Sequence, residues 1–504
     1  MSLLKITYNK ILDLLSRNNL LTEHNIKDCD LSKEIEFISD DSRNISENTL
    51  FFCKMARFKT EYLTDAIKKG AVCYVSETKR ETEGYACDYI IVNNILRAVA
   101  LIAPLYYDYP YKNLNLIGIT GTKGKTTTAY FIRNIIDEFT NSKNGLSTNI
   151  EKYTGKRSEE AILNTPEPCV MQLYFNEAKE CGIKYFTMEI SSQAYKRDRV
   201  YGVKFDNGIF LNIAEDHISP AEHENFDDYL NCKLEFLRNC SNIVLNRESD
   251  CFDRILAAAE SSETLKQITL YGSEKTKNEC DYYYTDVKRE GNLLHFQVKS
   301  DKCNYSQDFI ISTPGLFNIE NAMSAIVLCK TLGVDDESIR TGLIQTTVPG
   351  RMTILDDGDV TVIVDYAHNL LSFTKLYESL RYDYAEKKII SVGGAPGGKA
   401  YKRRKDFADI VGKNSDYIYL TAEDPQFEDV TEICEEIAGY MPDTQYEIVT
   451  DRGEAVTKAI TEANPGDVIV LLAKGGENYQ KINGKAEFYE SDLGIANRIL
   501  AERR

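Results

Sequence analysis

A glycine- and threonine-rich segment between a strand pattern and a helix pattern limits the fold of this chain more than any other feature. Residues 116–128 read LIGITGTKGKTTT. Before this segment, residues 113–119 alternate polar and apolar side chains as a strand does, and after it five apolar residues recur at helical spacing between positions 131 and 139. A strand, a glycine-rich turn and a helix in this order predict a nucleotide-binding α/β domain.

The loop carries groups that can hold a polyphosphate. Gly121 and Gly124 let the backbone approach the ligand, so that N–H groups and the positive end of the following helix point at phosphate oxygens. Lys125 can reach the β- and γ-phosphates, and Thr126 can bind Mg²⁺. The first glycine of the usual spacing stands one residue early, at Gly118. An ordinary strand-to-helix turn is the alternative, but the flanking patterns favour binding of a nucleoside triphosphate.

Composition points to a soluble protein of several domains. A chain of 504 residues exceeds one ordinary core and suggests about three domains. The net charge of −18 argues against a general nucleic-acid or anionic-membrane surface. The 13 cysteines include no CxxC pair, which fits reduced cytosolic thiols better than disulfides or zinc. Because no signal-peptide pattern or membrane-spanning apolar run is present, we expect a cytoplasmic enzyme with no membrane span and no nucleic-acid partner.

Changes in pattern along the chain divide it into three regions. Residues 1–112 hold short mixed elements and end in a tyrosine-rich linker, in which Pro110 ends any preceding helix. Residues 113–350 alternate strand and helix patterns, as expected for a parallel sheet covered on both faces. Residues 351–504 alternate again. The strand patterns of this last region lie at 363–365, 388–392, 417–420 and 468–472. The predicted fold class is therefore α/β.

Three polar residues of the second region lie where a phosphate or metal centre could form. Glu189 and His217 each follow an apolar run, and ligands bind at the carboxyl ends of parallel strands. Lys233 lies in an amphipathic segment further along. Taken singly, each has a simpler interpretation as a solvated strand end, a locally satisfied histidine or a surface lysine. Residue types alone favour these simpler interpretations.

An ordered series of motifs changes this balance. The motifs are 41–43 (DSR), 120–127 (TGTKGKTT), 164–167 (NTPE), 188–192 (MEISS), 199–200 (RV), 212–217 (NIAEDH), Lys233, 315–321 (GLFNIEN), 349–351 (PGR), 365–368 (DYAH) and 473–477 (AKGGE). In these motifs and their order the sequence resembles the Mur ligase family, the ATP-dependent amide ligases that extend the stem peptide of peptidoglycan. Departures from the family pattern stand at Gln193, Leu371, Ala473 and Gly476.

The resemblance implies three domains with separate ligands. Residues 1–112 would bind a UDP-sugar, residues 113–350 would form a central P-loop domain that binds ATP, and residues 351–504 would form a Rossmann-like domain that binds an amino acid. In the implied reaction, ATP phosphorylates the side-chain carboxylate of the D-Glu that ends UDP-MurNAc-L-Ala-D-Glu. The amine of an amino acid then attacks the acyl phosphate. Such phosphoryl transfer needs charge neutralisation and alignment, here from Mg²⁺ and the loop. We expect a monomer.

The resemblance also gives roles to residues that match the family's motifs. The residues implied in catalysis are Lys125, Glu189, His217 and Lys233. Those implied in Mg²⁺ binding are Thr126, Glu189, His217 and Lys233 as a carbamate. Those implied in ATP binding are Gly121, Thr122, Lys123, Gly124, Lys125, Thr126, Thr127, Asn318 and Arg351, with Asn321 and Asp365 at related positions. A carbamate forms only from a neutral amine, whereas a free lysine has a pKa of about 10.4. Nearby cations must therefore favour the anionic carbamate.

Two further sets follow from the same resemblance. Those implied in binding the UDP-substrate are Ser42, Asn164, Thr165, Ser191 and Arg199. Those implied in amino-acid recognition are Glu423, Asp424, Pro425, Gln426 and Glu477. Among the first set Arg199 has the clearest logic, because the substrate carries a diphosphate and carboxylates that suit a bidentate cation.

One position indicates which amino acid is added. Relatives that add meso-diaminopimelate carry an arginine at the position of Gln426, where it pairs the distal carboxylate. A neutral glutamine cannot do so, and a buried unpaired carboxylate is costly. Glu423 and Asp424 instead suit an ammonium group, so L-lysine is favoured. Arg403 and Arg404 keep meso-diaminopimelate open as the alternative. A folylpolyglutamate-type synthetase and a catalytically silent nucleotide-binding paralogue are more distant alternatives.

Overall fold

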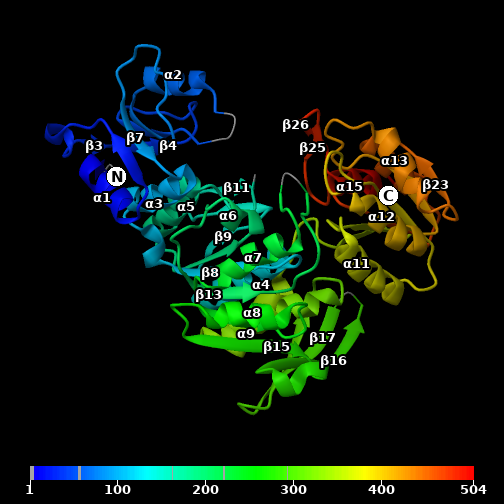
Figure 1. The fold of residues 1–504 in the computed structure, drawn as a ribbon. Helices are drawn as coiled ribbons and strands as arrows, with labels where there is room; N and C mark the ends of the chain where they lie inside the picture. The colour runs from blue at the N-terminus through cyan, green and yellow to red at the C-terminus, as the bar shows by residue number, and fades with distance from the viewer. Residues whose placement is uncertain (1–4, 55–57, 162, 220–221, 292, 504) are drawn as a thin grey trace.

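The computed structural model describes residues 5–54, 58–161, 163–219, 222–291 and 293–503. Three main sheets follow one another along the chain, one in each of the three sequence regions. In Figure 1 the N-terminal region (blue) and the C-terminal region (yellow to red) lie on different sides of the central region (cyan to green). The predicted α/β class is confirmed, while the boundaries near residues 112 and 350 stay predictions.

The N-terminal region is a small sheet covered by three helices. Its elements are β1 (Ile6–Thr7), α1 (Tyr8–Arg17), β2 (Leu21–His24), β3 (Glu34–Ile35), β4 (Phe37–Ser39), β5 (Thr49–Phe52), α2 (Thr60–Lys68), β6 (Ala71–Ser76), β7 (Asp88–Val92) and α3 (Ile95–Tyr106). The sheet order is β2-β7-β6-β5-β4. Leu50 and Phe52 of β5 pack in a core with α1 and α3, whereas Phe51 packs with α2, as the two-residue period of a strand requires.

The central region contains the longest sheet. Its elements are β8 (Asn115–Thr120), α4 (Lys125–Thr140), β9 (Gly145–Ser147), β10 (Glu151–Tyr153), β11 (Ser158–Glu160), α5 (Pro168–Glu180), β12 (Tyr185–Glu189), α6 (Ser192–Lys196), β13 (Phe205–Phe210), α7 (Phe226–Leu237), β14 (Cys240–Asn246), α8 (Phe252–Glu260), β15 (Gln267–Ser273), β16 (Tyr282–Glu290), β17 (Leu293–Ser300), β18 (Tyr305–Ile311), α9 (Phe317–Thr331) and α10 (Asp336–Gln345). The order is β11-β10-β9-β12-β8-β13-β14-β15-β16-β17-β18.

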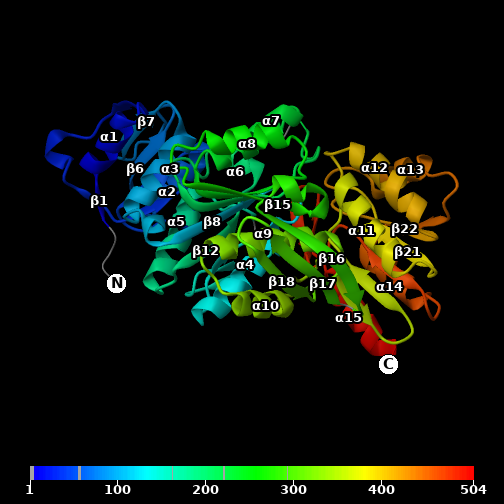
Figure 2. The ribbon, with the colours of Figure 1, turned by 90° about the horizontal axis from the view of Figure 1, so that it is seen from below.

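In the middle of the sheet, neighbouring strands pair in parallel, as predicted, in the order β9-β12-β8-β13-β14-β15-β16. At both edges of the sheet the strands pair antiparallel. The connection between β16 and β17 explains one edge, because only residues 291–292 join the two strands and a parallel pair needs a long crossover. Figure 2 shows α6, α7 and α8 on one face of the sheet and α4, α9 and α10 on the other. The expectation of a sheet covered on both faces is therefore confirmed.

Strand β8 carries this layering in its sequence. Ile117 and Ile119 pack in a core with α4 and α9, and Leu116 packs on the opposite face with α5 and α7. Gly118 lies within the strand, where an added Cβ would lie 2.5 Å from the Phe236 ring. Gly118 thus makes room for packing and is not part of the phosphate loop, which accounts for its early position in the motif.

The C-terminal region forms a six-stranded sheet in the order β19-β20-β24-β21-β22-β23, followed by a two-stranded hairpin. Its elements are β19 (Thr353–Asp356), β20 (Thr361–Val364), α11 (Leu370–Asp383), β21 (Ile389–Gly393), α12 (Lys402–Phe407), β22 (Tyr417–Leu420), α13 (Val430–Gly439), β23 (Tyr446–Ile448), α14 (Arg452–Thr461), β24 (Val468–Leu471), β25 (Tyr479–Ile482), β26 (Lys485–Phe488) and α15 (Asp492–Arg503). Helices α11, α12 and α13 share one core and α14 and α15 the other. Among all described residues, no helix combines the length and apolar character needed to cross a membrane.

Candidate active site

A cavity of about 450 Å³ lies between the central and C-terminal regions. Residues from both regions line it. The central region contributes Thr122, Lys123, Gly124, Lys125, Thr126, Thr127, Asn149, Asn164, Glu189, His217, Asn318 and Asn321, and the C-terminal region contributes Arg351, Asp365, Tyr366 and His368. All the residues predicted to bind ATP except Gly121 therefore line one cavity.

The phosphate loop forms one wall of this cavity. After β8, Gly121 has φ +150° and Gly124 has φ +87°, conformations that side chains other than glycine rarely adopt. A Cβ on Gly124 would lie 2.1 Å from Oδ1 of Asn321, so the close approach of α9 also requires glycine. No side chain of the described residues caps the N-terminus of α4. Its first N–H groups and the loop can therefore bind phosphate oxygens.

Oxygen and amide groups converge on Glu189 at the end of β12. The side chain of Glu189 is buried, with a relative exposure of 1%. The Thr126 hydroxyl donates to its Oε1 over 2.7 Å, and the Asn149 N–H donates to the same oxygen over 3.1 Å. The Asn164 amide donates to Oε2 over 3.1 Å. Carboxylate, hydroxyl and amide oxygens are the ligands that Mg²⁺ prefers, so the residues around Glu189 fit this ion.

Lys125 and Lys233 meet at the backbone of the loop. Their Nζ atoms donate to the Gly121 carbonyl over 2.8 and 2.9 Å, respectively. Lys233 lies on α7 with a relative exposure of 2%. Burial, followed by the positive charge of Lys125, holds the pKa of Lys233 well below its usual value. The neutral amine that carbamylation requires is therefore favoured at this position.

His217 contacts neighbours other than the metal-site residues. Its Nδ1 lies 3.0 Å from Oε1 of Glu222, and its backbone has φ +58°. Within the described part of the chain, no hydrogen bond or ion pair joins the ring to Glu189 or Lys233. His217 lines the cavity, and its role in binding metal stays a prediction.

Asp216, next to His217, connects the phosphate loop to the C-terminal region. Its carboxylate is buried and accepts hydrogen bonds from Arg403, over 2.9 Å, and from the Asn369 amide. Lys123 of the loop lies 3.7 Å away, and its Nζ is 3.2 Å from Nε2 of His368. Although burial disfavours the charge, Lys123, His217 and Arg403 hold the pKa of Asp216 well below its usual value. Asp216 is thus an ionised link between two domains.

This link makes a prediction about domain closure. Arg403→Met removes one of the positive charges that compensate the buried Asp216 carboxylate, which weakens the contact between the two domains. With saturating ligands we therefore expect this variant to have a larger radius of gyration than the unaltered protein in small-angle scattering. We also expect kcat/KM for each substrate to fall by about tenfold or more. Lys402→Met is the matched control, because Lys402 pairs with Glu215 across the same junction at exposed positions, where ion pairs contribute little. Equal behaviour of the two variants would contradict the role of Asp216.

Four of the five residues predicted to bind the UDP-substrate form one hydrogen-bonded group. The Thr165 hydroxyl donates to the Glu189 carbonyl over 2.9 Å and accepts from the Ser191 N–H over 3.0 Å. Arg199 donates to the Thr165 carbonyl over 3.2 Å. Asn164 completes the group through Glu189. The predicted substrate surface therefore adjoins the predicted metal site.

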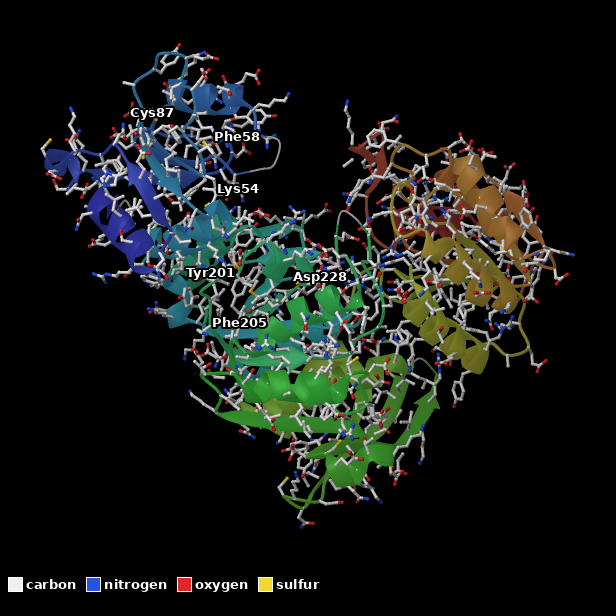
Figure 3. All side chains as sticks on the ribbon, in the orientation of Figure 1. Lys54, Phe58, Cys87, Tyr201, Phe205 and Asp228 are labelled. Carbon is white, nitrogen blue, oxygen red and sulfur yellow. The ribbon has the colours of Figure 1, made fainter. Side chains whose placement is uncertain are left out.

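Ser42 lies apart from that group, in the N-terminal region. One connection between the N-terminal region and this group runs through Lys54, which Figure 3 labels where the N-terminal and central regions meet. Lys54 Nζ lies 2.5 Å from Asp40 and 2.6 Å from Glu167, and Arg199 Nε lies 2.7 Å from the same Glu167. These ion pairs orient the two regions, so that a long UDP-sugar could contact both.

The predicted amino-acid site holds more charges than the sequence suggested. Buried Lys474 donates to Asp424 over 3.0 Å and to Glu477 over 2.6 Å, so a chain lysine already occupies part of the acidic site. Two carboxylates share this one ammonium group, and Glu423 adds a third. Burial raises the pKa of Glu423 to about 7, and the charge of Asp424 contributes. The Glu423 carboxyl group accepts no hydrogen bond from any described residue, so it can bind a substrate ammonium group.

Gln426 and the two arginines have fixed partners. The Gln426 N–H donates to the Lys481 carbonyl over 2.9 Å, which fixes Gln426 beside β25. Pro425 lies directly before it, with its carbonyl against Gly397, where a Cβ would lie 1.9 Å away. Arg404 pairs with Glu428 and Glu436, and Arg403 pairs with Asp216. These ion pairs already use both arginines, which weakens the case for either as the partner of a substrate carboxylate.

The residue that links the two sites, Tyr366, was not among those predicted to bind a ligand. Tyr366 lines the cavity, and its hydroxyl donates to Glu477 over 2.8 Å. The guanidinium carbon of Arg351 lies over the Tyr366 ring, 4.1 Å from the ring centroid. Asp365, before it, is buried and accepts N–H groups of Met352 and Ala367, each over 2.7 Å. The predicted nucleotide and amino-acid residues therefore adjoin through Tyr366.

Comparison with known proteins identifies the family. A model described as the Mur ligase middle domain matches residues 119–329, and one described as the Mur ligase glutamate ligase domain matches residues 350–475. A UDP-N-acetylmuramyl-tripeptide synthetase from Lactobacillus delbrueckii subsp. bulgaricus is 36% identical over 515 residues, with 99% of each chain covered. The chain belongs to the Mur ligase family. A UDP-N-acetylmuramoyl-L-alanyl-D-glutamate–L-lysine ligase from Enterococcus faecalis is 38% identical over 475 residues, with 94% of this chain and 92% of that one covered.

A solved structure supports the fold of this Mur ligase. The MurF ligase from Thermotoga maritima in complex with ADP superposes with a TM-score of 0.63 and covers 93% of this chain and 98% of its own. At 17% identity this likeness concerns the fold alone. The three-domain α/β architecture predicted from the sequence is thus shared with a nucleotide-bound member of the family.

One further cluster in this Mur ligase has metal-binding residue types. Ligand atoms of His223, Asp228 and Cys232 lie within 4.8 Å of one another. His223 Nδ1 is 3.0 Å from Asp228, its Nε2 is 2.9 Å from the Ser192 hydroxyl, and Lys196 pairs with the same carboxylate. Because these polar atoms already have partners, we interpret the cluster as a connection between α6 and α7. Figure 3 labels Asp228 on α7.

Proposed function

We propose that this Mur ligase joins L-lysine to the D-Glu of UDP-MurNAc-L-Ala-D-Glu and converts ATP to ADP and phosphate. One observation carries the proposal: the phosphate loop, Glu189 and Lys233 adjoin a single cavity that the C-terminal region closes. An acid cluster around Glu423 and Asp424 adjoins this cavity through Tyr366. The names of the two relatives describe tripeptide synthesis and lysine addition, which supports the same conclusion.

The residues around the cavity suit the two chemical steps. The loop N–H groups and Lys125 would align the ATP phosphates with the D-Glu carboxylate, which Asn164, Thr165 and Arg199 would orient. Mg²⁺ would be held by Thr126, Glu189 and carbamylated Lys233, and would neutralise phosphate charge. After the acyl phosphate forms, the neutral α-amine of lysine attacks the carbonyl carbon of the acyl phosphate, phosphate leaves, and the nitrogen loses a proton to give the amide. The closed junction excludes water, which would otherwise hydrolyse the acyl phosphate.

Amino-acid choice follows from the neutral side chain at Gln426. We expect phosphate release with UDP-MurNAc-L-Ala-D-Glu and ATP to require L-lysine. We expect meso-diaminopimelate to be used about a hundredfold less well in kcat/KM, which is roughly 2.7 kcal/mol and modest for one unpaired buried carboxylate. Gln426→Arg should reduce the preference for L-lysine over meso-diaminopimelate, because it supplies a cation for the distal carboxylate. Efficient use of meso-diaminopimelate by the unaltered protein would instead favour the diaminopimelate-adding alternative.

The pKa of Glu423 gives a pH dependence to lysine binding. Its carboxyl group, with a pKa of about 7, becomes charged as the pH rises, whereas the lysine side chain stays protonated up to about pH 10. The KM for lysine should therefore fall by up to about tenfold between about pH 6 and about pH 8. Glu423→Gln should flatten this pH profile and raise KM at the upper end. A profile that keeps its slope in the variant would assign the titration to another group.

Two properties stay predictions. A cytoplasmic location and a monomeric state rest on composition and on the family resemblance, respectively, and sedimentation of the purified protein would test the second. A catalytically silent paralogue is the alternative from another class. Retention of Lys125, Glu189 and Lys233 around one phosphate loop argues against it, because a silent protein has no need of such a centre.

A further inference from the structure

Lys152 on β10 is a buried lysine with an unusual set of partners. Its relative exposure is 3%. Its Nζ lies 3.1 Å from the Ser147 hydroxyl oxygen and donates to the Thr148 carbonyl over 2.5 Å. It also donates to the Leu163 carbonyl over 2.7 Å and to the Asn164 carbonyl over 3.0 Å. One ammonium group therefore connects two segments that lie 15 residues apart, at 147–148 and 163–164.

Each of these segments leads directly to Glu189. The residue after Thr148 is Asn149, whose N–H donates to Oε1 of Glu189 and whose Oδ1 lies 2.8 Å from the Thr126 hydroxyl oxygen. The other segment contains Asn164, whose amide donates to Oε2 of Glu189. The two carboxylate oxygens are thus held from two sides, and Lys152 fixes the backbone on both sides.

The partners of Lys152 are all uncharged. No carboxylate of the described residues lies within ion-pair distance of its Nζ, so carbonyl and hydroxyl dipoles alone compensate the buried charge. Burial lowers its pKa to about 8, against the favourable field of Glu189. A buried charge raises the free energy of the folded protein unless hydrogen bonds compensate it. The set of polar groups arranged around Lys152 therefore indicates a specific role.

We infer that Lys152 is a positioning residue for the phosphoryl-transfer centre: it holds Asn149 and Asn164 so that Glu189 and Thr126 present their oxygens to a divalent cation. The inference rests on the proposed function, because it concerns the Mg²⁺ that ATP requires. Lys152 itself does not contact Glu189 or Thr126 through any hydrogen bond. Outer partners of metal ligands commonly set metal affinity by about ten- to a hundredfold.

The test compares Lys152→Met with Lys156→Met. Lys156 lies in the same hairpin but is exposed, 3.8 Å from Glu180, so its loss is a matched control. Mn²⁺ replaces Mg²⁺ as a probe, and its binding to the ADP complex is measured by electron paramagnetic resonance. We expect Lys152→Met to weaken Mn²⁺ binding by at least about tenfold and to raise the Mg²⁺ concentration for half-maximal activity similarly. The KM for L-lysine should change by less than about twofold, because the amino-acid site is separate.

Two outcomes are decisive. Unchanged Mn²⁺ binding in a folded Lys152→Met protein would overturn the inference, whatever the activity. If this variant does not fold, Asn164→Ala removes the side-chain amide through which a Lys152-bound segment holds Oε2 of Glu189, and unchanged Mn²⁺ binding there would also overturn the inference. Failure of the proposed function would look different: the unaltered protein would bind Mn²⁺ with ADP but release no lysine-dependent phosphate.

Discussion

Replacing Lys233 with alanine is expected to abolish ligation while the protein stays folded. The side chain lies at 2% relative exposure beside Lys125 and the Gly121 carbonyl, so it has no surface role to lose. The variant cannot form the proposed carbamate, which would supply the metal with an anionic oxygen ligand. We expect kcat to fall by at least about a thousandfold, which is about 4 kcal/mol of transition-state stabilisation.

Rescue distinguishes a carbamate from a structural lysine. Short carboxylic acids such as formate or acetate fit the space vacated in Lys233→Ala and can replace the carbamate oxygen, so partial activity should return with their concentration. Lys204→Ala is a control, because Lys204 is exposed and donates to Asn239. Thermal unfolding checks that all variants are folded. Near-normal ligation by Lys233→Ala, without added acid, would remove Lys233 from the mechanism.

The second large effect is expected at Lys125. Lys125→Ala should lower ATP-dependent turnover by about a thousandfold or more, because the loop would lose the cation predicted to reach the transferred phosphate. UDP-substrate binding should persist, since Ser42, Thr165 and Arg199 lie outside the phosphate loop. Calorimetric titration of the UDP-substrate measures this directly, with Lys266→Ala as an exposed control. An equal collapse of UDP-substrate affinity and turnover would contradict two separate binding surfaces.

Local sequence patterns predict much of this fold. The alternation over residues 113–119 and the helical spacing over residues 131–139 predict the strand β8 and the helix α4, because both elements pack against cores with regular periods. Their bounds differ from the patterns, since β8 covers Asn115–Thr120 and α4 already begins at Lys125. The antiparallel edges of the central sheet were not predicted, since strand direction depends on connection length and not on residue type. The glycine at position 118 is required by tertiary packing, because the ring of Phe236 from α7 fills the space that a side chain would need.

The site shows the same division between local and long-range information. Motif residues such as Thr126 and Glu189 do lie together, over 2.7 Å, although they are 63 residues apart. The partners that tune them do not follow from any motif. Asp216 meets Arg403 and Asn369 only because the C-terminal region closes onto the loop, and Lys474 reduces the charge of the acid cluster only in the folded chain. Such contacts are determined by packing between distant segments, which one sequence does not reveal.

In the proposed reaction, this Mur ligase activates the side-chain carboxylate of D-Glu as an acyl phosphate and transfers the acyl group to L-lysine. The most direct measurement uses UDP-MurNAc-L-Ala-D-Glu labelled with ¹⁸O in the side-chain carboxylate of D-Glu, together with ATP, Mg²⁺ and L-lysine. Mass spectrometry then follows both products. We predict a UDP-MurNAc-tripeptide that has gained one lysine, with one ¹⁸O transferred to inorganic phosphate. Absence of the lysine product, or phosphate that carries no label, would contradict the account.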